Sequence, residues 1–342
     1  MENMENQDKL LDINHLCVTY KTEDGIVYAV NDLNLHIGSK ETLGFVGETG
    51  AGKTTTAMAI MGLLPSPPGK ITDGEITFCG KSMIKISDKE RRKILGEEIS
   101  MIFQDPMTSL NPSMRVADQI MEMIRLHKKI SKHEAYEEAC QLLEMVGIKR
   151  ERAKDYPHQF SGGMKQRVVI AIALACRPKL IIADEPTTAL DVTIQAQIME
   201  LIGELQKELD MAMILVTHDL GVVASVADKI QVMYAGKIVE IGTAEEIFYD
   251  PRHPYTWGLL QSLPILSRGK EWLPTLPGMP PTLIHPPKGD AFAERNAYAM
   301  RIDYEKDPPV FQVTDTHYAA TWLLDERAPK VKAPIGERRY GK

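Results

Sequence analysis

Apolar residues along the chain change their spacing around residue 47. Leu43 to Val46 form a short, continuous apolar run, which predicts a buried strand. From Thr54 to Leu64 the apolar residues recur at helical spacing, which predicts a helix. The residues between these runs are rich in glycine, so the pattern predicts a strand, a glycine-rich turn and a helix in succession.

The turn also matches the phosphate-binding pattern G-x-x-x-x-G-K-[ST], from Gly47 to Thr54. Glycines without Cβ atoms let backbone N–H groups surround an anion at the positive end of the following helix. A glycine-rich turn that binds nothing is the alternative, but the strand and helix on either side favour a nucleoside triphosphate site. Lys53 is expected to reach the β- and γ-phosphates, and the Thr54 hydroxyl to ligate Mg²⁺. The residues expected to bind ATP here are Gly47, Glu48, Thr49, Gly50, Ala51, Gly52, Lys53, Thr54 and Thr55.

A second buried apolar run, Leu180 to Ala183, ends in two adjacent acids. An acid at the carboxyl end of a core strand lies near the phosphate loop in such folds and orients Mg²⁺, which is the role expected of Asp184. Glu185 follows directly and can polarise the attacking water as a general base. The alternative is that the two acids only begin a surface turn before Pro186.

Ser161, Gly162 and Gly163 precede an apolar helical run, which predicts another helix N-terminus suited to phosphate. One nucleotide needs only one such site within the chain. The simplest solution is that this second site faces a nucleotide held by a partner subunit.

The remaining pattern predicts an α/β fold. Apolar residues mostly alternate from Leu11 to Tyr20, which favours strands in the region 11–37. Residues 117–130 and 133–148 have helical patterns. Ile214 to Thr217 read as a strand that places His218 at its carboxyl end.

Composition narrows the class of protein. The 342 residues allow about two domains, and 44% hydrophobic residues are ample for a packed core. The acidic, polar start predicts no signal peptide, and no apolar run is long enough to predict a membrane span. Four scattered cysteines predict reduced thiols rather than disulfides or a zinc site. A net charge of -7 gives no basic surface for nucleic acid.

The motifs together resemble those of ATP-binding-cassette (ABC) ATPases. FSGGMKQR is similar to the LSGGQ signature, and the phosphate loop, Gln104, signature, Asp184-Glu185 and His218 follow in the family's order. The resemblance implies a P-loop NTPase (RecA-like) core with an N-terminal antiparallel β portion and a helical subdomain over about residues 89–165. We therefore expect a polar tail over 1–9, an ATPase domain over 10–250 and a C-terminal extension over 251–342.

The resemblance also implies roles for single residues. Tyr20 resembles the aromatic residue that stacks on adenine, although it could simply end a strand. Gln104 resembles the glutamine that touches Mg²⁺ or water and senses the transport partner, and His218 the histidine that contacts the γ-phosphate. Ala189-Leu190-Asp191 resembles the D-loop at the dimer interface. Contacts to the partner's ATP are expected from Ser161, Gly162, Gly163, Met164 and Asp191, with Met164 replacing the family's usual glutamine.

Longer phrases, among them YDPRHPYTWGLLQSLP, resemble the D-type ATPase subunits of oligopeptide and dipeptide importers. The expected partners are an F-type ATPase, two transmembrane permease subunits and an external peptide-binding protein, with this chain at the cytoplasmic face of the membrane. ATPases of nickel and antimicrobial-peptide importers share these phrases and remain alternatives. The chain has a single cassette that keeps its catalytic residues. This agrees less well with an exporter, a soluble ABC protein or a non-catalytic ATP-binding partner.

The extension is rich in proline, which predicts a mostly extended segment without a regular core of its own. In many members of the resembling family it holds four cysteines that ligate an iron–sulfur cluster. The matching positions here are Asp290, Asn296, Asp303 and Thr321. Because such clusters require thiolate ligands, we expect no cluster in this chain.

Overall fold

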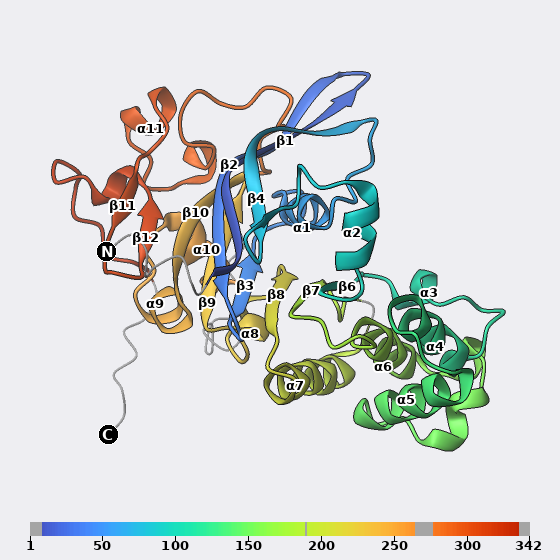
Figure 1. Ribbon diagram of the computed structural model, residues 1–342. Coiled ribbons are helices and arrows are strands. Elements are labelled where there is room, and N and C mark those ends of the chain that lie inside the picture. The colour runs from blue at the N-terminus through green and yellow to red at the C-terminus, as the bar shows by residue number, and fades with distance from the viewer. Residues whose placement is uncertain (1–8, 189, 264–275, 335–342) are drawn as a thin grey trace. The chain divides into compact units, whose positions relative to one another are not determined.

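The computed structural model describes residues 9–188, 190–263 and 276–334 (Figure 1). The expected N-terminal tail, except Lys9, and Ala189 of the expected D-loop lie outside the described residues. The chain divides into two compact units. Unit 1 comprises Met1–Leu11, Ile37–Thr42 and Thr77–Val216, and unit 2 comprises Asp12–His36, Leu43–Ile76 and Thr217–Lys342.

Unit 1 contains three parallel strands in the order β8-β7-β6. They are β6 (Ile99–Ile102), β7 (Leu180–Asp184) and β8 (Ala212–Thr217), and all their residues are buried. Continuous apolar runs are typical of parallel strands covered on both faces, which is how the sequence pattern around residue 180 predicts a strand. Helix α7 (Val192–Glu208) packs against α6 (Gly162–Ala173) in the same unit.

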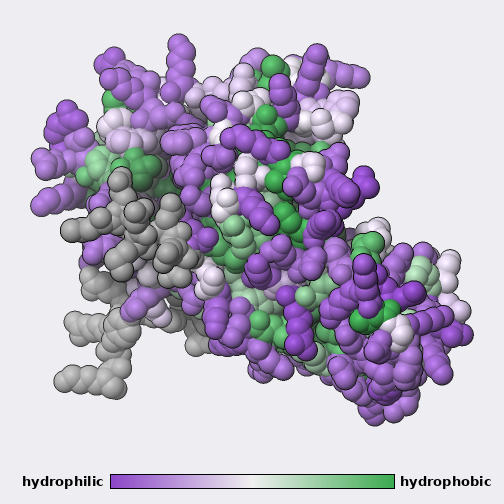
Figure 2. Space-filling model, in the orientation of Figure 1, coloured by the Kyte–Doolittle hydropathy of each residue, from purple (hydrophilic) through white to green (hydrophobic). Residues whose placement is uncertain are grey.

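The rest of unit 1 is mainly helical, with α4 (Val116–His127) and α5 (Lys132–Met145) packed on each other and on α6 (Figure 1). Helix α4 buries Val116, Ile120 and Ile124 on one face, and hydrophilic side chains cover most of the visible surface of this region in Figure 2. The shorter elements are α2 (Asp88–Ile94), α3 (Pro106–Ser109), η1 (Arg150–Lys154) and η2 (Pro157–Gln159).

Unit 2 is built on a sheet of order β11-β12-β10-β9-β3. β3 (Thr42–Val46) pairs in parallel with β9 (Lys229–Tyr234), which pairs antiparallel with β10 (Lys237–Thr243). β12 (Tyr318–Ala320) continues from β10 with Glu240 opposite Ala319, and β11 (Val310–Gln312) follows. The helices of this unit are α1 (Lys53–Met61), α8 (Leu220–Val223), α9 (Ala244–Tyr249), α10 (Pro254–Gln261) and α11 (Arg301–Glu305).

A second sheet has the order β2-β1-β4-β5, with β1 (Lys9–Thr22), β2 (Gly25–Gly38), β4 (Gly69–Phe78) and β5 (Lys81–Ser82). Between Leu11 and Tyr20 of β1, buried residues alternate with more exposed ones except between Ile13 and Leu16. These two residues are three positions apart and would point to opposite faces of a regular strand, yet both are buried. His15 between them has a left-handed backbone (φ 51°), and this extra residue shifts the pleat. Gly74 fits beside it because a Cβ there would lie 2.5 Å from the His15 carbonyl oxygen.

The C-terminal extension packs into unit 2 instead of forming a core of its own. Besides β11, β12 and α11 it has the short turns η3 (Ala293–Arg295) and η4 (Trp322–Leu324). Its buried Phe292 stacks edge-on against Tyr234 of β9 at 5.3 Å. Glu240 of β10 is buried and accepts hydrogen bonds from the backbone N–H groups of Arg252 and His253 and from the His317 ring. These polar contacts and β12 join the extension to the sheet.

Candidate nucleotide site

The phosphate loop of unit 2 runs from the end of β3 to the first turn of α1. Gly52 is the N-cap of α1 and has φ 110°, a conformation that residues with a Cβ rarely adopt. A Cβ on Gly47 would lie 2.1 Å from the Met233 carbonyl oxygen. The Lys53 ammonium donates to the carbonyls of Gly47 (2.7 Å) and Glu48 (3.0 Å), so its charge lies within the loop. The loop therefore places a cation and a helix N-terminus where an anion can bind both.

Two other expected residues also belong to unit 2. Tyr20 lies near the end of β1, and its hydroxyl donates to the Thr55 hydroxyl at 3.4 Å, which places the ring beside the start of α1. His218 directly follows β8 and is exposed. The next residue, Asp219, caps α8 by accepting from the Gly221 amide at 2.7 Å.

The expected catalytic carboxylates belong to unit 1. Asp184 is buried at the carboxyl end of β7. Glu185 has φ 45°, a strained backbone for a residue other than glycine, and such strain occurs most often at functional sites. Its Oε2 atom accepts from Gln104 Nε2 (2.9 Å) and from the Thr188 hydroxyl (2.9 Å). The structure thus brings the expected base and the expected sensor glutamine into direct contact, which the sequence alone did not predict.

The signature residues lie on the surface of unit 1 at the start of α6. Ser161 is the N-cap, and its hydroxyl accepts from the Met164 amide at 3.4 Å. Asp191 caps α7 in the same way, through the Ile194 amide at 3.0 Å. Gly163 fits closely against α7, because a Cβ there would lie 2.6 Å from Ile194 Cγ2. Helix α7 therefore supports the exposed helix N-terminus.

Met164 is the position at which the signature departs from the family pattern. Its sulfur accepts a hydrogen bond from Arg152 Nη1 at 3.5 Å, and the Arg152 guanidinium lies over the Phe160 ring at 4.3 Å. The thioether thus packs against a neighbouring arginine, and Ser161 and Gly162 at the start of α6 are exposed.

Comparisons with known proteins agree with this geometry. A family model described as "ABC transporter" matches residues 30–188, and one described as "Oligopeptide/dipeptide transporter, C-terminal region" matches residues 239–302. The oligopeptide transport ATP-binding protein OppD of Bacillus subtilis is 59% identical over 95% of this chain and 92% of its own. The dipeptide transport ATP-binding protein DppD of Lactococcus lactis is 52% identical over 95% and 94%.

The chain belongs to the ABC transporter ATP-binding proteins of the oligopeptide/dipeptide group. Among solved structures, the ATP-binding cassette MJ0796, a dimer in a post-hydrolysis state with ADP and Pi, matches with TM-score 0.62 and 30% identity. That match covers 68% of this chain and 98% of the solved one. The α/β P-loop ATPase fold and the ATPase activity expected from the sequence are confirmed.

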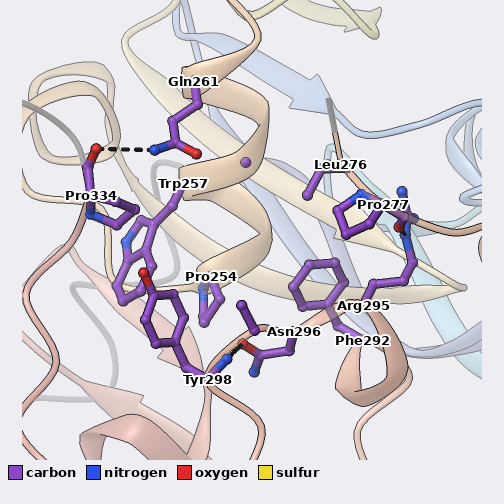
Figure 3. A pocket seen from close by; sticks show the side chains of 12 residues that line it. Pro254, Trp257, Gln261, Leu276, Pro277, Phe292, Arg295, Asn296, Tyr298 and Pro334 are labelled. Carbon is purple, nitrogen blue, oxygen red and sulfur yellow. Dashed lines mark hydrogen bonds between the residues drawn. The ribbon is translucent and has the colours of Figure 1, made fainter. Parts of the chain in front are cut away.

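In this ABC ATPase the phosphate loop contacts the C-terminal extension, which no pattern in the sequence predicts. Arg295 of the extension forms an ion pair with Glu48, and the Tyr255 hydroxyl of α10 accepts from the Glu48 amide at 2.8 Å. Figure 3 shows Arg295 beside Pro277 and Phe292, on one side of a cavity of about 220 Å³ that Trp257 and Tyr298 also line. No sequence motif could reveal this contact, because it depends on the folded path of the extension.

The four positions at which the family resemblance implied cysteines, Asp290, Asn296, Asp303 and Thr321, are all buried. At three of them, Asp290, Asn296 and Thr321, a side-chain oxygen accepts from the backbone N–H two residues ahead. Burial, with a smaller contribution from the nearby Asp303, raises the pKa of Asp290 to about 6. One oxygen each of Asp290 and Asp303 has no hydrogen-bond partner. Oxygen and amide groups in these places do not fit an iron–sulfur cluster, which needs thiolates.

Across residues 9–188, 190–263 and 276–334, no helix is both long and apolar enough to cross a bilayer. The same part of the chain contains no group of three or more His, Cys, Asp or Glu side chains arranged to hold a metal ion.

Proposed function

We propose that this chain is the D-type ATPase subunit of a membrane importer and that its ATP hydrolysis drives uptake of oligopeptides or dipeptides. The observation that carries the proposal is the combination of ATPase motifs with the C-terminal region of oligopeptide/dipeptide transporters. Relatives with 50–59% identity are named as oligopeptide or dipeptide transport ATP-binding proteins. The partners are two permease subunits, an F-type ATPase and an external peptide-binding protein, and the permeases hold this chain at the cytoplasmic face of the membrane.

The nucleotide site of this importer is composite. One triphosphate binds the phosphate loop at the start of α1, and the N-terminus of α6 in the partner ATPase covers it. Two observations support this: the helix N-terminus behind Ser161 is exposed, and a related cassette was solved as a dimer with ADP and Pi. Closure around ATP and release after hydrolysis convert phosphate chemistry into movement of the permeases.

Within the site each residue has a distinct role. Lys53 and the loop amides bind the phosphates, and Tyr20 stacks on the adenine. Glu185 accepts a proton from the attacking water, Gln104 orients it, and His218 contacts the γ-phosphate. Mg²⁺ takes oxygen ligands, which the Thr54 hydroxyl, the Gln104 amide oxygen and the Asp184 carboxylate provide, in part through water. Leu190 and Asp191 lie at the interface with the partner.

The extension of this subunit works without an iron–sulfur cluster. Support comes from the donor chemistry of the four buried positions, where two carboxyls, an amide and a hydroxyl replace four thiolates. The remaining cysteines do not restore a cluster site, because Cys17, Cys79, Cys140 and Cys176 all lie outside the extension.

Ser161→Arg tests the composite site. The bulky side chain fills the helix N-terminus of α6 and leaves this chain's own phosphate loop unchanged. The isolated subunit should bind ATP with its usual affinity, whereas ATP-dependent pairing with the F-type subunit and peptide uptake by the reconstituted transporter should be lost. Fluorescent nucleotide binding, size-exclusion chromatography with ATP and uptake into proteoliposomes measure the three properties.

The matched control is Ser39→Arg, which adds the same side chain at an exposed turn between β2 and β3. It should leave pairing and uptake unchanged. Normal peptide uptake by the Ser161→Arg transporter would contradict the composite site. If the unmodified transporter took up neither oligopeptides nor dipeptides, the proposed cargo would be wrong.

A further inference from the structure

The phosphate loop contains a carboxylate, the side chain of Glu48, and a carboxylate cannot itself attract phosphate. Glu48 directly follows Gly47, inside the loop that surrounds the nucleotide's phosphates. A negative charge there opposes the binding of a triphosphate, because like charges repel most strongly where water is partly excluded. The loop therefore needs something to offset the charge of Glu48.

Arg295 offsets it with two parallel hydrogen bonds. Nη1 donates to Glu48 Oε2 at 2.7 Å, and Nη2 donates to Oε1 at 2.9 Å, so both carboxylate oxygens are engaged. This bidentate arrangement is the strongest way in which an arginine binds a carboxylate, and it also fixes the direction of the carboxylate. The Glu48 carboxylate therefore points toward Arg295 of the extension.

The guanidinium is itself held from other sides. Its Nε donates to the Pro277 carbonyl at 2.8 Å, and Nη1 also donates to the Tyr234 hydroxyl at 3.1 Å. The side chain of Arg295 is only 5% exposed, and that of Glu48 is 26% exposed. The hydrogen bonds to Glu48 raise the pKa of Arg295 above its usual value. An arginine buried in this way can hold its partner in one position.

The backbone of the loop is attached to the same region. The Glu48 amide donates to the hydroxyl of Tyr255, a residue of α10. Glu48, Thr49 and Gly50 also line one small cavity together with Pro281 and Leu283 of the extension. The extension thus contacts the loop through a side-chain pair and a backbone hydrogen bond, and the two segments line a common cavity.

We propose that Arg295 is a positioning residue for nucleotide binding, which neutralises Glu48, holds its carboxylate away from the phosphates and so makes the C-terminal extension part of the nucleotide site. The proposal rests on the proposed function in one respect, namely that the loop from Gly47 to Thr54 binds the triphosphate. Nothing in the ATPase motifs assigns this role to the extension.

The test is a charge-rescue experiment on the full chain with Mg²⁺ and a fluorescent ATP analogue. Arg295→Met keeps an unbranched buried side chain but leaves Glu48 unpaired, and it should weaken ATP binding about tenfold. Adding Glu48→Gln should restore the affinity to within about twofold of the unmodified chain, because the repelling charge is gone. The loss in Arg295→Met should be larger for ATP than for AMP, since repulsion grows with the number of phosphates.

Arg301→Met is the matched control. Arg301 also lies in the extension and pairs with Glu305 at 2.7 Å, but its side chain is 92% exposed. The Arg301→Met variant should bind ATP as the unmodified chain does. If Arg295→Met does not fold, Arg295→Lys decides the question, because a lysine keeps the positive charge but cannot form the two parallel hydrogen bonds, so ATP binding should weaken and Glu48→Gln should restore it.

Unchanged affinity in Arg295→Met, or no rescue by Glu48→Gln, would overturn the proposal, as would weaker ATP binding by Glu48→Gln alone. Lys53→Ala separates this outcome from a failure of the proposed function. If Lys53→Ala abolishes ATP binding while Arg295→Met binds normally, only the role of Arg295 is wrong. If Lys53→Ala binds ATP normally, the phosphate loop itself has been misassigned.

Discussion

Glu185 combines a left-handed backbone with two hydrogen bonds to one of its oxygens. In Glu185→Gln the amide oxygen can still accept from Gln104 and Thr188, but the side chain can no longer take a proton from water. We expect ATP to bind with normal affinity while phosphate release falls by about 10²-fold or more. Nucleotide binding and steady-state phosphate release on the complete transporter measure the two effects.

Glu208→Gln is the control for this substitution, because Glu208 is an exposed residue at the end of α7. It should hydrolyse ATP at the normal rate. Turnover in Glu185→Gln within a few fold of normal would show that another group acts as the base.

The pH dependence of stability at Asp290 tests the proposal that the extension holds no iron–sulfur cluster. The folded-state pKa of Asp290, about 6, lies above the ordinary value of 3.8, so ionisation of the buried carboxyl lowers the free energy of unfolding as pH rises through this range. Asp290→Asn removes that cost and can still accept from the Phe292 amide. We expect it to stabilise the protein by about 1–3 kcal/mol at pH 7.5, by about half as much at pH 5, and not at all below about pH 4.

Chemical denaturation at several pH values measures this gain, with the exposed Asp315→Asn as a control that should show none. If a metal or cluster used Asp290, the same substitution would instead destabilise the protein. Stoichiometric iron with acid-labile sulfide in anaerobically purified protein would likewise show that the extension holds an iron–sulfur cluster.

At the scale of elements, the signature depends on how closely α6 approaches α7. Gly163 has no room for a Cβ beside Ile194, whereas a Cβ on Gly162 would meet Leu190 at 3.5 Å, an ordinary contact. Gly163→Ala should therefore lower the free energy of unfolding by about 1–3 kcal/mol, because α7 must shift. Gly162→Ala should unfold at nearly the normal temperature. Equal melting temperatures for the two variants would contradict this account of the packing.

The sequence predicted these elements well where a local rule decides them. The helix expected from Thr54 to Leu64 is α1, which begins one residue earlier at Lys53 and ends at Met61 because Gly62 adopts φ 64°. The strand expected over 180–183 is β7, one residue longer. Residues 99–102 form strand β6, although the sequence placed them in the expected helical subdomain. Four mostly apolar residues are too few to distinguish a strand from a helix by their spacing. Their pairing with β7 decides the conformation.

At the scale of the whole molecule, the roles of single motifs were easier to predict than the contacts between distant segments. The prolines of the extension predicted that it lacks a core of its own, but not that β12 would pair with β10. Pairing of this kind depends on which sheet edge is open after the rest has folded. The candidate catalytic residues followed from motifs, whereas the contact of Gln104 with Glu185 joins segments 81 positions apart and needed the structure.

The pair between Glu48 and Arg295 spans 247 positions of the chain, and this separation has a consequence during protein synthesis. All the residues of unit 1 have been made once position 216 is reached, whereas unit 2 needs segments from both ends of the chain. Since domains fold as their residues emerge from the ribosome, unit 1 can fold first. The phosphate loop is made early, yet it receives its arginine only when translation is nearly finished. An incomplete chain that ends before residue 295 therefore carries every ATPase motif but leaves Glu48 without its countercharge.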